Sequence, residues 1–229
     1  MGRGPHLCFL HGFCENQTIW KNLVEKLSEN YTCTSIDLPG FGFSADLKFG
    51  SIPEVVVQIR ELFKKLDIIN PILIGHSMGG YLVAEYIKQF GDEINAAAFV
   101  HSSTRADNVL KKQNREKVIN FVLKNGGAKF FPSFVDGLVA DRNREKYQTE
   151  LLNLVQNTPD SSIIDALNAM KNREDRLDAL SQFGKPTLFI MGAEDNHYSS
   201  EEIYHQASRC KLSQIDIIEN VGHLSMFEN

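Results

Sequence analysis

The sequence has no hydrophobic run as long as a membrane helix, no paired cysteines and no excess of positive charge. A membrane-spanning helix needs about 18 or more apolar residues in succession, and no stretch of the 229 residues comes near that length. The net charge of −5 argues against nucleic acid as a general partner. We therefore expect no membrane span and no nucleic-acid function.

Cysteine usage and the start of the chain bear on location. Four cysteines lie scattered, without a C-x-x-C pair or a histidine cluster at zinc spacing. Cys8 and Cys33 fall inside apparent core strands, where a free cysteine behaves as a small hydrophobe. The start, MGRGPHLCFLHGF, lacks the longer apolar segment and small-residue cleavage site of a secretory signal. These features predict a cytoplasmic protein with no metal site.

What the chain does contain is an alternation of buried strands and amphipathic helices. Helical spacing of apolar residues occurs over residues 19–27, 51–66 and 80–90. Short apolar runs typical of buried strands occupy residues 7–10, 31–36, 71–74, 96–100, 187–191 and 214–218. This alternation predicts an α/β protein with a mostly parallel, doubly wound sheet flanked by helices.

The stretch at residues 103–182 interrupts that rhythm. It shows several helical patterns, no convincing strand, and an aromatic cluster, FFPSF, at a break expected at Pro132. Residues 101–182 carry a net charge of +2, which leaves −7 for the remainder. We expect residues 1–102 and 183–229 to form the core, and residues 103–182 to form a helical cap over the carboxyl edge of the sheet, where open α/β folds bind ligands.

A serine lies in the turn between the third expected strand and the next helix. Residues 75–79 read G-H-S-M-G, which is the G-x-S-x-G pattern of a nucleophile elbow. Gly75 and Gly79 are needed because such a tight turn leaves no room for a Cβ atom, and the strained turn lifts the Ser77 hydroxyl toward solvent. The alternative is that Ser77 only caps the helix. The strand–turn–helix context favours a nucleophile.

A serine nucleophile needs a base and an orienting carboxylate. His223 follows the last expected strand, in a loop that we expect at the carboxyl edge of the sheet within reach of Ser77; a plain surface histidine is the alternative. Asp195 follows the preceding strand and completes the chain order Ser, Asp, His. Glu194 and Asp107 remain alternative acids. The sequence thus predicts a catalytic triad of Ser77, Asp195 and His223.

Acyl transfer also needs an oxyanion hole of preorganised N–H groups. The amide of Met78, directly after the serine, is one candidate donor. The amide of Phe13, in the loop after the first strand, is the other. We expect the side chains of Phe13 and Met78 to line the substrate pocket as well, unless they are ordinary core residues. His11 is expected to hold the loop rather than to act as a second base.

Taken together, these motifs resemble the α/β-hydrolase superfamily. The matching pieces are H-G-F at 11–13, D-L-P-G-F-G at 37–42, G-H-S-M-G-G at 75–80, G-A-E-D at 192–195 and G-H at 222–223. The resemblance implies Ser77 as nucleophile, His223 as base and Asp195 as orienting acid. It is closest to the small carboxylesterase branch, which includes the pimeloyl-carrier-protein methyl ester esterases of biotin synthesis. Members usually have two antiparallel strands before the first one expected here, and a helix after the histidine.

The resemblance implies a serine hydrolase that cleaves carboxylic esters of small or medium acyl groups through an acyl-enzyme, without a cofactor. Activity should fall as His223 protonates near pH 6.5, its ordinary pKa. Thioester or C–C bond hydrolysis uses the same triad, and a non-catalytic binding protein on this fold is a further alternative. A carrier-protein ester is another, since an acidic carrier would suit the basic residues of the expected cap; a solvated helix face is the plainer interpretation of these side chains, Arg142, Arg144, Lys171, Arg173 and Arg176.

Overall fold

The computed structural model describes residues 2–229 and contains one six-stranded sheet. Its spatial order is β2-β1-β3-β4-β5-β6, and every neighbouring pair is parallel. This confirms the predicted fold class. The strands begin and end within two residues of the ranges expected from the sequence: β1 (His6–Leu10), β2 (Thr32–Ile36), β3 (Ile72–His76), β4 (Ala96–Val100), β5 (Thr187–Gly192) and β6 (Ser213–Ile218).

Helices follow most of the strands. The α-helices are α1 (Lys21–Leu27), α2 (Ile52–Lys65), α3 (Met78–Phe90), α4 (Val109–Asn125), α5 (Gly127–Asp136), α6 (Arg144–Val155), α7 (Asp160–Asn172), α8 (Leu177–Phe183), α9 (Ser200–Ala207) and α10 (Ser225–Glu228). Short 3-10 helices are η1 (Gln17–Trp20), η2 (Gly42–Ser44), η3 (Gly91–Glu93) and η4 (Asp141–Asn143).

The order of the strands determines where the loops of a site converge. From β1 the chain moves outward to β2 and then returns to β3 on the other side of β1. Open α/β sheets bind ligands at such a reversal point, outside the carboxyl ends of the strands. The loop after β1 and the turn between β3 and α3 lie at this edge. The sheet therefore brings these two segments together.

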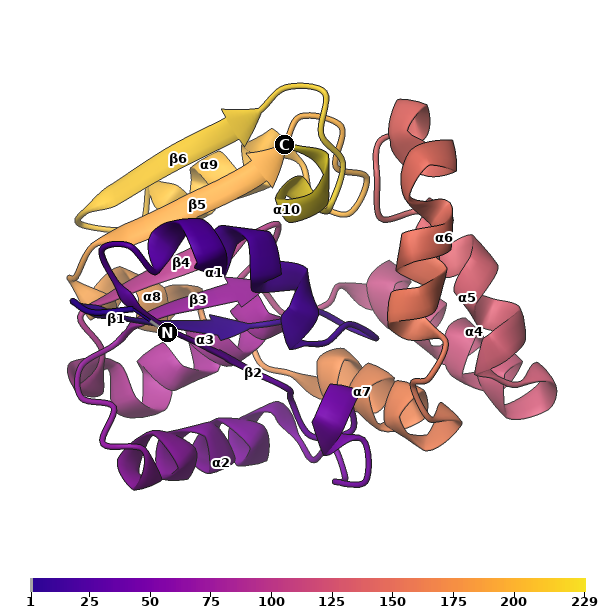
Figure 1. Ribbon diagram of the computed structural model, residues 1–229, viewed down its shortest axis with the longest axis horizontal. Helices are drawn as coiled ribbons and strands as arrows, with labels where there is room; N and C mark the ends of the chain where they lie inside the picture. Colours follow the sequence, from indigo (N-terminus) through magenta and orange to yellow (C-terminus); the bar gives the residue numbers. More distant parts are fainter. Residues whose placement is uncertain (1) are drawn as a thin grey trace.

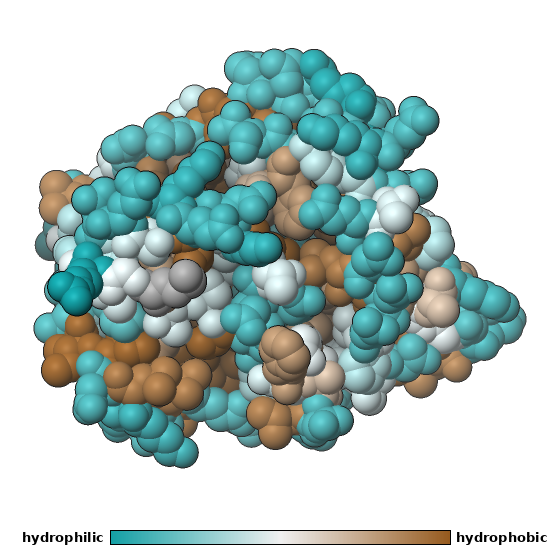
Figure 2. Space-filling model, in the orientation of Figure 1, coloured by the Kyte–Doolittle hydropathy of each residue, from teal (hydrophilic) through white to brown (hydrophobic). Residues whose placement is uncertain are grey.

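Apolar side chains cover both faces of the sheet, as expected for parallel strands with helices on either side. Phe99 and Phe189 are paired in register, with stacked rings 5.3 Å apart between centroids. Phe9 packs against Trp20, with ring centroids 5.2 Å apart, in a separate cluster. Figure 2 shows a mainly hydrophilic surface, with hydrophobic residues visible between the regions of α1 and α6. No helix in residues 2–229 is long and apolar enough to cross a membrane.

The helices α4, α5, α6 and α7 lie together beyond the carboxyl ends of the strands (Figure 1). Residues 103–182, all of which the structure describes, contain no strand. The helix break expected at Pro132 is wrong, because this proline lies inside α5 and the helix continues to Asp136. Helix α8 packs against α3, alongside the sheet. The division into core and cap at residues 103 and 182 stays a prediction.

Candidate active site

The turn at Ser77 is strained in the way that its glycines predict. Ser77 has φ 47° and ψ −112°, a conformation that L-residues rarely adopt. A Cβ atom on Gly75 would lie 2.4 Å from the carbonyl carbon of Gly79. A Cβ atom on Gly79 would lie 2.4 Å from the backbone oxygen of Leu10. Both glycines are therefore required by close backbone contacts, and the second contact seats the elbow against the end of β1.

The Ser77 side chain is not used for capping. Ser77 occupies the N-cap position of α3, yet its side chain makes no capping hydrogen bond. Its backbone is held instead, by donation from its N–H to Val100 (3.0 Å) and from the Ser102 hydroxyl to its carbonyl (2.6 Å). Within residues 2–229 no hydrogen-bond partner is found for the Ser77 hydroxyl, and the residue lines a cavity. This arrangement leaves the hydroxyl free to react.

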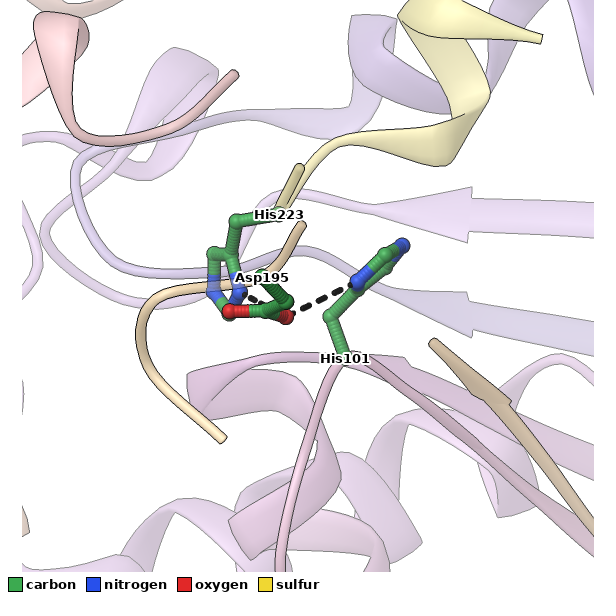
Figure 3. Close-up of side chains that lie close together, drawn as sticks. All are labelled: His101, Asp195 and His223. Carbon is green, nitrogen blue, oxygen red and sulfur yellow. Dashed lines mark hydrogen bonds and ion pairs between the residues drawn. The ribbon is translucent and has the colours of Figure 1, made fainter. Parts of the chain in front are cut away.

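His223 and Asp195 form a direct hydrogen bond at the same edge of the sheet. The Nδ1 atom of His223 lies 2.8 Å from Oδ2 of Asp195, and both side chains are almost fully buried. Figure 3 shows them on separate loops, the Asp195 loop after β5 and the His223 loop before α10. Because Nδ1 donates to the carboxylate, Nε2 keeps its lone pair. His223 lines the same cavity as Ser77.

The two alternative acids are engaged elsewhere. Glu194 pairs with Arg142 at the surface. Asp107 is buried and binds two guanidinium groups, those of Arg115 and Arg173. Of the three carboxylates weighed from the sequence, Asp195 is the one that the structure places beside His223.

His101 is a member of this cluster that the sequence reasoning missed. It is fully buried at the end of β4, with φ 49°. An ionised carboxylate can only accept, so Nδ1, which lies 3.0 Å from Oδ2 of Asp195, carries the ring proton, and Nε2 accepts from the backbone N–H of Ser225 (3.2 Å). The N–H of Gly192 approaches Nδ1 at the longer distance of 3.3 Å. His101 and His223 thus flank one carboxylate (Figure 3). A signal was present in the sequence, since a histidine directly after a buried strand lies at the carboxyl edge.

The surroundings shift the proton affinities of these groups. Burial lowers the pKa of His223 well below its ordinary value, despite the nearby charge of Asp195. Burial lowers the pKa of His101 in the same direction. Burial alone would raise the pKa of Asp195, but electrostatic stabilisation by the adjacent His223 ring and donated hydrogen bonds, among them that of His101, hold it far below its usual range. At neutral pH the cluster is an ionised carboxylate between two neutral imidazoles.

The two candidate oxyanion amides are both free. Within residues 2–229 no acceptor is found for the N–H of Phe13, which lies in the loop after β1. Met78 is the first residue of α3, where N–H groups have no partner inside the helix. The Phe13 side chain lines the cavity, whereas the Met78 side chain is buried in the core and is not among the lining residues.

Two buried histidines hold the loops around the elbow. His11 bonds the Gly12 carbonyl through Nδ1 (2.8 Å) and accepts from the N–H of Leu38 through Nε2 (2.9 Å), as expected for a residue with a structural role. His76 lies 2.9 Å from the carboxylate of Glu15 and 2.8 Å from the carbonyl of His223. Burial opposes protonation of His76, but the charge of Glu15 raises its pKa overall.

Glu15 ties this network to the oxyanion loop. Its Oε2 atom accepts a hydrogen bond from the N–H of Gly12 (2.7 Å) as well as that of His76. The chain of contacts from Gly12 through Glu15 and His76 to His223 therefore connects the first loop with the last one. No sequence signal marked Glu15, because a charged residue in a loop is usually exposed.

The cavity has a volume of about 350 Å³ and opens onto Ser77 and His223. This size is at the lower end of small-molecule sites. Helices α4, α5 and α7 contribute much of its wall, together with Phe13. The apolar part of that wall consists of Phe13, Val118, Phe130, Phe134, Leu138, Leu167 and Met170.

The trio of His101, Asp195 and His223 also has the composition of a metal site, since its ligand atoms lie within 4.8 Å of one another. The Nδ1–Oδ2 distances of 3.0 and 2.8 Å are those of direct hydrogen bonds. The second ring nitrogen of His101 is bound to Ser225. A hydrogen-bond network therefore accounts for the trio without an ion.

The basic residues considered for an acidic carrier each have an acidic partner in the chain. The pairs are Arg142–Glu194, Arg144–Asp141, Lys171–Glu116, Arg173–Asp107 and Arg176 with Glu85 and Glu174. Each of these positive charges therefore has a negative partner within the protein, although Asp107 is shared between Arg173 and Arg115.

Comparisons with known proteins place the chain in a family. A pimeloyl-acyl-carrier-protein methyl ester esterase of Vibrio vulnificus is 33% identical over 104 residues, which are 45% of this chain and 39% of the relative. The match thus spans about two fifths of that relative's length. Among solved structures, a thermophilic esterase from Thermogutta terrifontis superposes with a TM-score of 0.91 at 25% identity, covering 98% of this chain and 84% of that one.

An esterase from Exiguobacterium antarcticum has the same fold, with a TM-score of 0.89 at 22% identity, covering 99% of this chain and 87% of that one. Residues 5–229 match the family described as alpha/beta hydrolase fold. That match covers nearly the whole chain, including the elbow and the loops that carry Asp195 and His223. The chain therefore belongs to the α/β-hydrolase family.

Proposed function

We propose that this protein is a serine esterase that hydrolyses carboxylic esters of small or medium acyl groups. The observation that carries the proposal is the free hydroxyl of Ser77, held on a strained turn in the same cavity as His223. Asp195 holds His223 in the tautomer that a general base requires. The esterase names of several relatives support the same chemistry.

In the proposed reaction, Nε2 of His223 takes the proton of Ser77 as Oγ attacks the ester carbonyl. The oxygen that becomes negative accepts hydrogen bonds from the amides of Phe13 and Met78. Collapse of this intermediate breaks the bond to the alcohol, which leaves with the proton from His223. Water, activated by His223, then attacks the acyl-enzyme and releases the acid. Asp195 stays ionised throughout and stabilises the imidazolium that forms.

The form of the cavity supports a compact substrate. A volume of about 350 Å³ with a largely apolar wall suits a short or medium acyl chain. The helices over the carboxyl edge, within residues 103–182, act in this proposal as a cap that limits access to Ser77. Thioester and C–C bond hydrolysis use the same triad, so a substrate panel separates these reactions from ester hydrolysis.

A carrier-protein ester is the second candidate, because several relatives bear that name. Against it stands the pairing of the basic residues, such as Lys171 with Glu116, which leaves few free cations for an acidic carrier. Hydrolysis of a carrier-bound methyl ester that weakens with salt supports this candidate. Equal rates on the carrier-bound and free esters remove it.

The test is a panel of 4-nitrophenyl esters of increasing acyl length, with Ser77→Ala as the inactive variant. We expect the wild type to be fastest on short or medium chains, and Ser77→Ala to lose about 10⁴-fold or more in kcat. A fluorophosphonate probe should label the wild type at Ser77, located by peptide mass spectrometry. The matched control is Ser208→Ala, which changes an exposed serine at the end of α9 that does not line the cavity. Full activity or labelling in Ser77→Ala contradicts the proposal.

A further inference from the structure

One side of the cavity wall is cationic. Lys111 and Arg115 are four positions apart on α4, so they lie on the same face of this helix, and both line the cavity. Tyr81 and Tyr198 lie beside them in the wall and are hydrogen-bonded to each other through their hydroxyl groups. We call these four residues the cationic wall. The proposed ester hydrolysis makes no use of it.

Arg115 shares its carboxylate with a second arginine. The buried carboxylate of Asp107 accepts a hydrogen bond from Nε of Arg115 and another from Nη1 of Arg173 (2.7 Å). Two guanidinium groups are therefore matched by a single negative charge. The guanidinium of Arg173 lies over the ring of Tyr81, 3.7 Å from its centroid.

Lys111 adds a further positive charge. Its Nζ atom lies over the ring of Tyr198, 4.7 Å from the centroid, and 3.4 Å from the carbonyl of His197. Within residues 2–229 it forms no ion pair with a carboxylate. Of the described residues 2–229, Glu15 is the only acidic one that lines the cavity, and its carboxylate is bound to His76. Among the described residues, Lys111, Arg115 and Arg173 therefore have one carboxylate partner between them, that of Asp107.

Within residues 2–229 no oxygen acceptor is found for the Nη1 atom of Arg115. This atom donates to the sulfur of Met170 (3.4 Å), and a thioether is a weak acceptor. Met170 and Arg115 both line the cavity. The positive charges also affect Tyr81. Burial alone would raise the pKa of its hydroxyl, but the charges of Arg173 and Arg115 outweigh that effect, so the pKa is lowered.

We propose that the cationic wall is a subsite for a carboxylate carried by the substrate, so that the preferred esters are those with a free carboxylate at the end remote from the scissile bond. A carboxylate supplies the missing negative charge, and it accepts hydrogen bonds from Nη1 of Arg115 and from Lys111. The inference rests on the proposed esterase function and narrows its substrate class. The apolar wall then contacts the methylene chain between the two ends.

The test compares two esters that differ by one charge, 4-nitrophenyl hydrogen adipate and methyl 4-nitrophenyl adipate. We expect the wild type to prefer the acid by roughly tenfold or more in kcat/KM at low ionic strength, since a hydrogen bond to a charged group corresponds to at least about that factor. A second pair places the carboxylate on the alcohol side: the acetyl ester of 4-hydroxybutanoate against butyl acetate. Preference in either pair supports the subsite and shows which side of the ester enters it.

The variants are Lys111→Met and Arg115→Met, each expected to bring the ratio of the two kcat/KM values close to one. The matched control is Lys112→Met, which removes an exposed charge next to Lys111 that does not line the cavity and should keep the wild-type ratio. Lys111→Met breaks no ion pair and stays informative even if Arg115→Met is unstable. Ratios near one in the wild type for both pairs, or ratios unchanged in the variants, overturn the inference. Hydrolysis of neither ester contradicts the esterase proposal instead.

Discussion

The Nδ1 atom of His101 lies 3.0 Å from Oδ2 of Asp195, the same oxygen that accepts the hydrogen bond of His223. The carboxylate is therefore held from two sides, and a change in one histidine alters the charge felt by the other. His101 does not line the cavity, so in the proposed reaction it acts through Asp195. It is a positioning residue.

Replacement of this residue, His101→Asn, tests that relationship. Asparagine tolerates the left-handed backbone of φ 49° but withdraws the imidazole. Loss of one hydrogen bond to a buried charge predicts a fall in kcat of about tenfold or more. The less stabilised carboxylate should attract the His223 proton more strongly and move the acid limb of the pH profile upward. His205→Asn, in an exposed position, is the control; a lower rate with an unmoved acid limb points to a merely structural role.

Substitutions of the adjacent residues Asp195 and Glu194 distinguish the role of the orienting acid from a general effect of negative charge in this loop. Asp195→Asn should reduce kcat by about 10⁴-fold, because the amide favours the wrong tautomer of His223. Glu194→Gln, one residue earlier, only loses a surface pair with Arg142 and should retain activity. Steady-state kinetics of both variants decide the matter, and equal losses in the two speak against Asp195 as the orienting acid.

The acid limb of activity should lie below pH 6.5, the value expected from the sequence. Burial lowers the pKa of His223, so the imidazole stays unprotonated, and able to act as a base, to a lower pH. Activity is then lost only as the pH falls through that lowered pKa. The measurement is kcat/KM on a neutral ester between pH 4 and 9, with the folded fraction followed by circular dichroism. A midpoint at or above 6.5 contradicts the burial of the base.

The elbow glycine is expected to be intolerant of a single methyl group. In Gly75→Ala the new Cβ lies 2.4 Å from the backbone of Gly79, which predicts destabilisation by about 2–3 kcal/mol and loss of activity. Gly137→Ala is the control: its φ is −84° and its Cβ would meet nothing nearer than 3.5 Å. That variant should be neutral or more stable by up to about 1 kcal/mol. Chemical denaturation measures the free energy of unfolding of both variants. Similar values for Gly75→Ala and Gly137→Ala would show that the backbone of the elbow shifts to accommodate the methyl group.

The buried pair of His76 and Glu15 should contribute to stability in a pH-dependent way. Glu15→Gln removes the charge that raises the pKa of His76, and breaking such a buried pair costs about 3–5 kcal/mol. Because the folded pKa lies above the unfolded one, this contribution is fully present below about pH 6.5 and is lost as the pH rises through the folded pKa. The measurement is the free energy of unfolding of both proteins between pH 5.5 and 8.5.

Glu25→Gln, at an exposed position of α1, is the control for this change and should stay within about 0.5 kcal/mol of the wild type at every pH. A difference between wild type and Glu15→Gln that grows with rising pH argues against a protonated His76.

Most of the fold was predictable because its signals are local. Runs such as residues 96–100 are apolar and bounded by polar residues, so each strand was identified to within two residues. The nucleophile elbow was equally predictable, since the tight turn that requires glycine at positions 75 and 79 lies within a few residues of Ser77. Pro132 was misjudged because α5 continues through it, held by packing of Phe131 and Val135 in the core.

By itself the sequence determined the class of the fold, the order of the strands along the chain and the residues near Ser77, because backbone sterics and hydrophobic periodicity act over short separations. Only the tertiary structure decided which acid reaches His223, that His101 shares it, and that Arg115 and Arg173 converge on Asp107. These contacts join residues from different loops and helices. Their geometry depends on how polar groups that are distant in the sequence pair once they are buried together. No local sequence pattern encodes which groups pair.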